Sequence, residues 1–84
     1  MYIENSNDIA SFIIWADEGR CGICLTPTGE APNEIETDGD LALAISMARQ
    51  VIARQAWRWA TPEGGALLDL MLWTADQAEH ASPQ

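Results

Sequence analysis

The sequence DIASFIIWA (residues 8–16) is followed by DEGR (17–20) and CGICLT (21–26). The two outer segments are rich in β-branched and aromatic residues, which favour strands. The short segment between them contains Gly19, which can adopt the positive φ of a bulged turn. The pattern therefore predicts an antiparallel β-hairpin.

A helix over residues 8–16 is the competing interpretation. Apolar residues in this segment also recur at helical spacing, and one of the polar residues 5–7 could cap such a helix. We favour the hairpin because the sequence FIIW (residues 12–15) is a poor helix former and because a partner strand follows at once.

Residues 26–40 predict a turn, an edge strand and the start of a helix. The sequence TPTGEAPN (residues 26–33) is typical of turns. Residues 34–37 favour a short third strand, placed at an edge because its outward side is charged. Asp38, Gly39 and Asp40 end this strand, and an aspartate suits the N-terminus of the next helix.

Residues 41–60 are predicted to form the longest uninterrupted helix, because they contain neither proline nor glycine and many good helix formers. Two apolar stripes run along it, so both sides need cover, one from the sheet and one from the last helix. The first stripe comprises Leu41, Ile45, Ala48, Ile52 and Trp59, and the second comprises Leu43, Met47 and Val51, continued by Arg54 and Arg58.

Residues 62–80 predict a second helix, with Thr61, Pro62 and Glu63 as its start signal. The pair Gly64-Gly65 loosens the first turn, so we expect a firm helix only from Ala66. Residues 81–84 form a tail.

The whole chain, residues 1–84, is expected to be a single α+β domain with two layers. In this fold a β-rich acidic layer (8–37) packs on the two C-terminal helices.

The net charge of −9 results from thirteen acidic residues and four arginines, with no lysine. Such a chain is repelled by nucleic acid phosphates and by anionic membrane surfaces, so its expected macromolecular partners are basic protein surfaces. The N-terminal residues lack the pattern of a signal peptide, and no apolar run approaches the roughly 20 residues of a membrane span. With only two cysteines, these features predict a cytoplasmic protein.

Candidate catalytic and metal-binding residues are few. Cys21 and Cys24 have redox or zinc spacing, but in a strand they point to opposite faces, and structural zinc needs four ligands. His80 is the single histidine, and its place at a helix end is explained by the helix dipole. We therefore expect no enzyme, no cofactor and no metal, and keep a thiol or metal module as a minor alternative.

The acidic residues are unevenly distributed. Residues 1–40 contain nine acids and one arginine, whereas residues 41–60 contain three arginines and no acid. Alternate acids in an extended chain fall on one face about 6.6 Å apart, close to twice the ~3.4 Å phosphate spacing of a DNA strand. The predicted partner-binding residues are Glu34, Glu36, Asp38 and Asp40, extended by Asp17 and Glu18.

A second surface is the alternative interface, through which the chain would form a homodimeric regulatory or scaffold module. Tryptophan and arginine are favoured anchors of such interfaces. Trp15, Trp59 and Trp73 are expected in the core, while Trp57 lies off the main stripe. The alternative interface comprises Leu43, Met47, Val51, Arg54, Trp57 and Arg58.

In size, charge and its acidic row, the chain resembles the small acidic inhibitors that phages and mobile elements encode, such as anti-CRISPR proteins and DNA mimics. The resemblance is one of class, and no family motif matches. It implies a stoichiometric inhibitor that occupies a basic, nucleic-acid-binding surface of a larger protein complex, without direct contact to nucleic acid.

Overall fold

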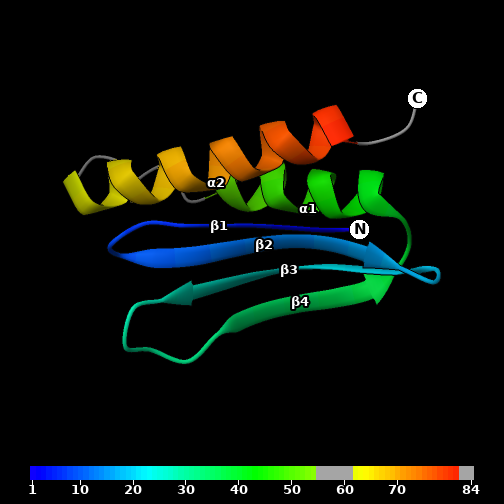
Figure 1. Cartoon of the computed structure of the whole chain (residues 1–84), viewed down its shortest axis with the longest axis horizontal. Helices are drawn as coiled ribbons and strands as arrows, with labels where there is room; N and C mark the ends of the chain where they lie inside the picture. Colours follow the sequence, from blue (N-terminus) through cyan, green and yellow to red (C-terminus); the bar gives the residue numbers. More distant parts are fainter. Residues whose placement is uncertain (55–61, 82–84) are drawn as a thin grey trace.

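The computed structural model describes residues 1–54 and 62–81 as a four-stranded sheet with two helices on one of its faces (Figure 1). The strands form an antiparallel meander in the order β1-β2-β3-β4. The α+β architecture with two layers, predicted from the sequence, is thus confirmed. The elements are β1 (Tyr2–Ser6), β2 (Ala10–Asp17), β3 (Arg20–Pro27), β4 (Asn33–Asp38), α1 (Leu41–Arg54) and α2 (Pro62–Ala81).

The predicted hairpin is present as β2 and β3, so the alternative of a helix over residues 8–16 is wrong. Asp17 pairs with Arg20, which leaves a loop of two residues. Both loop residues have positive φ, 49° at Glu18 and 80° at Gly19, as a type I′ turn requires. The expected bulge is therefore absent, because a turn of this type already matches the twist of the strands.

Strand β1 was not predicted from the sequence. It pairs with β2 at one edge of the sheet, and its Ile3 packs against the core. Its other inward residue is Asn5, whose amide nitrogen donates to Thr74 Oγ1 at 3.1 Å and to Gln77 Oε1 at 2.7 Å, both on α2. A polar residue at an inward position hides the alternation that would reveal the strand.

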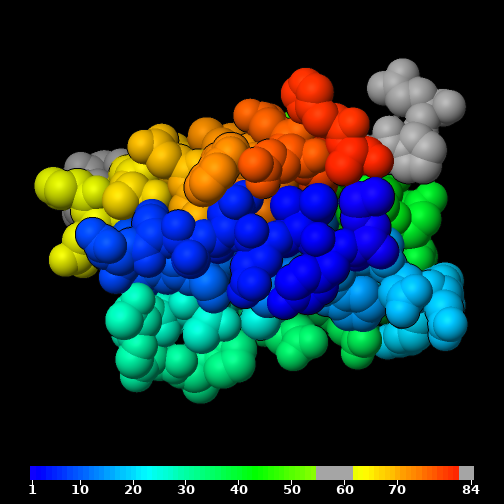
Figure 2. Space-filling view, in the orientation of Figure 1, coloured from blue at the N-terminus to red at the C-terminus, as the bar shows by residue number. Residues whose placement is uncertain are grey.

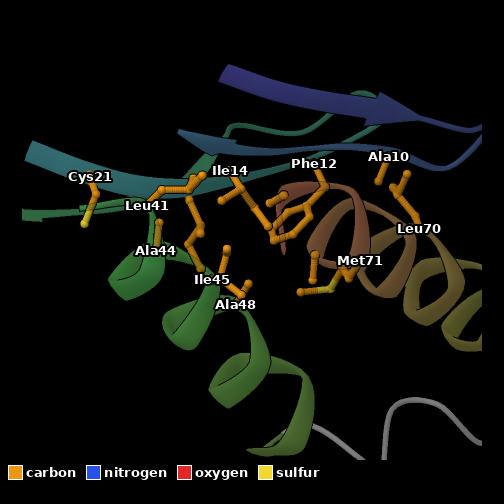
Figure 3. Packing of buried hydrophobic residues seen from close by; sticks show 13 residues of the cluster. Ala10, Phe12, Ile14, Cys21, Leu41, Ala44, Ile45, Ala48, Leu70 and Met71 are labelled. Atoms are coloured by element: carbon orange, nitrogen blue, oxygen red, sulfur yellow. The ribbon is translucent and has the colours of Figure 1, made fainter. Parts of the chain in front are cut away.

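The core lies between the sheet and the helices (Figure 3). Alternate residues of β2 and β3 point into it because successive strand residues face opposite ways. Helix α1 packs mainly on β2 and β3, and α2 packs on β1 and β2, so β4 extends beyond the helical layer. The buried residues are Ala10, Phe12, Ile14, Cys21, Ile23, Leu41, Ala44, Ile45, Ala48, Leu70, Met71, Thr74, Ala75 and Ala78.

Helix α1 begins where the sequence predicted. The carboxylate of Asp40 accepts a hydrogen bond from the backbone N–H of Leu43 at 3.1 Å, which is an N-cap. The predicted first stripe is buried as far as Ala48, and Ile52 is half-buried. The predicted continuation of this helix, with Trp59, lies outside the described residues.

Helix α2 begins at Pro62, four residues before the expected firm start at Ala66. Gly64 is buried within the first turn. A glycine at a packed position leaves room for a close neighbour, so it need not weaken the helix there.

Candidate acidic interaction surface

One face of the sheet is not covered by either helix. Its side chains belong to the strand residues that alternate with those of the core. We call this surface the open face. Its residues are Tyr2, Glu4, Ser6, Ser11, Ile13, Trp15, Asp17, Arg20, Gly22, Cys24, Thr26, Glu34, Glu36 and Asp38.

Two acidic segments that are distant in sequence meet at one end of the sheet. The backbone N–H of Gly39, after β4, donates to the carbonyl of Gly19, in the β2–β3 turn, at 2.8 Å. Figure 2 shows this turn, in light blue, protruding at one end of the molecule. We call the acids gathered here the acidic corner, which comprises Asp17, Glu18, Glu36, Asp38 and Asp40.

Arg20 is the one cationic side chain in this corner among the described residues, and the N-terminal ammonium of Met1 lies at its border, where it donates to the carbonyl of Ala16 at 2.6 Å. The guanidinium of Arg20 lies 2.7 Å from the Asp38 carboxylate and 3.5 Å from that of Glu36. The hydrogen bond with Asp38, together with the negative potential of Glu36, raises the pKa of Arg20. These ion pairs are exposed to solvent and contribute little to the free energy of unfolding. The corner keeps a large excess of negative charge.

The predicted row of four acids is shorter in the structure. Glu34, Glu36 and Asp38 lie on the open face, about 6.6 Å apart along β4. Asp40 leaves the row, because its carboxylate caps α1. Glu34 lies at the far end of the row from Asp17 and Glu18, so these six residues form a corner with a short extension.

Asp40 supplies α1 with an oxygen that accepts a hydrogen bond and with a negative charge, and substitution can separate these two contributions. Asp40→Ala is expected to lower the free energy of unfolding by about 1 kcal/mol. Asp40→Asn keeps an oxygen acceptor for Leu43 and is expected to cost only a few tenths of that loss. Urea denaturation followed by circular dichroism measures both. Equal losses in the two variants would show that charge, and not capping, is what Asp40 supplies.

Trp15 lies on the open face. The prediction that it belongs to the core is therefore wrong. The indole of Trp15 runs over Gly22, where an added Cβ would lie 2.8 Å from the indole Nε1. Tyr2, at the edge of the same face, is 61% exposed. The placement of Trp73 in the core is also wrong, since it is 51% exposed on α2. Trp15 is an odd number of residues from Phe12 and Ile14, so the alternation of a strand places it on the face opposite these two core residues. This signal could have shown that Trp15 lies outside the core.

The two cysteines point to opposite faces, as predicted. Cys21 is buried against α1, whereas Cys24 is half-buried on the open face, and both thiols are free. Burial, then the nearby carboxylate of Asp40, raises the pKa of Cys21, which disfavours the reactive thiolate. His80 Nδ1 lies 2.7 Å from the carbonyl of Asp76. No group of three metal-ligating side chains occurs in the described part of the chain.

The described residues of the alternative interface differ in their exposure to solvent. Leu43 is 40% exposed, but Met47 and Val51 are half-buried against the core. Arg54 is exposed at the end of α1. Trp57 and Arg58 lie outside the described residues.

The remaining arginine of α1, Arg49, joins the two helices. It lies 2.9 Å from the carboxylate of Asp76 and 2.6 Å from that of Glu79, both on α2. The hydrogen bonds to these acids raise its pKa. Arg49 therefore links α1 to α2.

Comparisons with protein-family models, curated proteins and solved structures found no match to this chain. Within residues 1–54 and 62–81, neither helix combines the length and the hydropathy needed to cross a bilayer.

Proposed function

We propose that this protein is a stoichiometric, cytoplasmic inhibitor whose acidic corner occupies a basic, nucleic-acid-binding surface of a larger protein complex. The observation that carries the proposal is the convergence of Asp17 and Glu18 with Glu36 and Asp38 around Arg20. Neither capping nor edge protection requires the hairpin tip and β4 to present carboxylates together.

A surface of this kind suits a site that normally binds phosphates. Arginine forks accept carboxylate and phosphate oxygens in the same planar geometry. The excess negative charge accelerates encounter with a basic surface and repels nucleic acid itself. The corner therefore favours a protein partner over direct binding to DNA or RNA.

The open face adds apolar contact beside these charges. Trp15, Ile13 and Tyr2 lie on the uncovered side of β1 and β2, next to the acidic strand across β3. Aromatic residues are frequent anchors of protein interfaces, where the charges mainly set the rate and the specificity of association. The open face therefore presents a small aromatic and apolar patch next to the carboxylates of β4.

The test is capture of a partner from an extract of the source organism by the immobilised protein, at low and at high salt. We expect a basic protein or complex to be retained at low salt and released as salt rises, because screening weakens exposed charge pairs. Retention that does not change with salt would contradict the proposal.

Arg20 offers a second test, because any basic partner competes with it for Asp38 and Glu36. Arg20→Gln removes the internal cation and leaves both carboxylates free. We expect this variant to bind the captured partner about two- to fivefold more tightly, within the range of an exposed ion pair. Titration calorimetry measures the change. Weaker binding by Arg20→Gln would show instead that Arg20 contacts the partner.

A further inference from the structure

Strand β4 has an edge that no other described strand pairs with, since it lies last in the sheet. The bond from Gly39 N–H to Gly19 identifies which β4 residues point to β3. Bonded and non-bonded pairs alternate along an antiparallel ladder. The backbone of Ile35 therefore turns toward β3, while the N–H and C=O groups of Glu34 and Glu36 turn toward the open edge.

The two sides of this edge differ in chemistry. On the open face, Glu34 and Glu36 present carboxylates. On the helix side, β4 borders a groove of about 670 Å³, and Ile35 at its margin is 48% exposed. The apolar lining of the groove includes Phe12, Ile23, Leu25, Val51, Leu67 and Met71, and its polar lining comprises Glu30, Asn33 and Glu34.

We propose that β4 accepts an extended segment of the partner protein as a fifth strand, with cationic and apolar side chains in alternation. Cationic residues opposite Glu34 and Glu36 would share their face, and the apolar residues between them would lie beside Ile35 over the groove. The inference rests on the proposed function, because the same acidic strand supplies the contact charges.

A second copy of this chain does not fit the same edge through its own β4. If two β4 strands paired, residues on the same face would lie opposite each other, so Glu34, Glu36 and Asp38 would meet only acids. Like charges directly opposite are destabilising, and such edges discourage self-association. The charge pattern therefore selects a basic occupant.

The test uses a synthetic seven-residue peptide in which lysine and valine alternate, added to the uniformly ¹⁵N-labelled full chain at low salt. We expect saturable binding, and at least about tenfold slower hydrogen exchange at the amides of Glu34 and Glu36. One control peptide has the same residues in blocks, and the other is the alternating peptide N-methylated at its lysines, the residues whose backbone would pair with Glu34 and Glu36. Both are expected to bind at least about tenfold more weakly.

A pair of variants separates backbone pairing from charge. Glu36→Pro removes the outward N–H but leaves pairing with β3 intact, whereas Glu36→Gln removes only the charge. We expect Glu36→Pro to weaken binding of the alternating peptide about tenfold more than Glu36→Gln does. The N-methylated peptide provides the same comparison on the unmodified protein if Glu36→Pro fails to fold.

Equal binding of the alternating, blocked and N-methylated peptides would overturn strand addition but leave charge-driven binding by the acidic corner standing. Failure of every basic peptide to bind would also overturn the proposal that β4 accepts a fifth strand. The proposed function is then decided separately, by the salt-dependent capture of a partner.

Discussion

Replacing Phe12 by alanine is expected to lower the free energy of unfolding by about 3–5 kcal/mol. Phe12 is 1% exposed and projects from β2 between the two helices (Figure 3). Its removal leaves a cavity that the surrounding side chains of two helices and a sheet cannot fill by simple collapse. A domain is stable by only about 5–15 kcal/mol in total, so this variant should unfold in mild urea.

The neighbouring residue Ile13 provides the matched control. It lies on the open face of the same strand and is only half-buried. Ile13→Ala is expected to cost about 1 kcal/mol, typical of a substitution away from the core. Urea denaturation by circular dichroism compares the two. If Phe12→Ala were no less stable than Ile13→Ala, the assignment of the two faces of the sheet would be incorrect.

Reversing charge at the acidic corner is expected to weaken binding of the captured partner at least about 100-fold. The variant combines Asp17→Lys, Glu36→Lys and Asp38→Lys, three exposed residues that hold no core contact. Attraction then becomes repulsion, so most of the loss at low salt should appear in the association rate. Surface plasmon resonance at two salt concentrations measures it.

The matched control changes the net charge by the same amount elsewhere. Asp8→Lys, Glu63→Lys and Asp69→Lys alter exposed residues in the β1–β2 turn and on α2. We expect this control to reduce affinity less than about tenfold, through the general field alone. An equal loss in both triple variants would show that net charge matters and that the corner does not.

The sequence predicted those elements whose local signals agree with their tertiary environment. The hairpin was found because both strands are apolar and one glycine marks the turn between them. The start of α1 was found because Asp40 has the chemistry of an N-cap. Strand β1 was missed because Asn5 faces inward and forms its hydrogen bonds with α2, which no local pattern reveals.

The candidate site was only partly predictable for the same reason. Alternation along β4 indicated that Glu34, Glu36 and Asp38 share a face, and the structure places them so. Alternation cannot show that Asp40 turns away to cap α1. The approach of the hairpin tip to β4, which brings Asp17 and Glu18 into the corner, depends on a tertiary contact between two turns.

Competition between this protein and nucleic acid for one surface of the captured partner distinguishes occupation of a nucleic-acid-binding surface from binding elsewhere on that partner. A fluorescently labelled double-stranded DNA is bound to the partner, and the unlabelled protein is titrated in while anisotropy is followed. We expect full displacement of the DNA by the wild-type protein at stoichiometric concentration, and no displacement by the variant with Asp17→Lys, Glu36→Lys and Asp38→Lys. A stable complex containing the partner, the DNA and this protein together would contradict the proposed occupation of that surface.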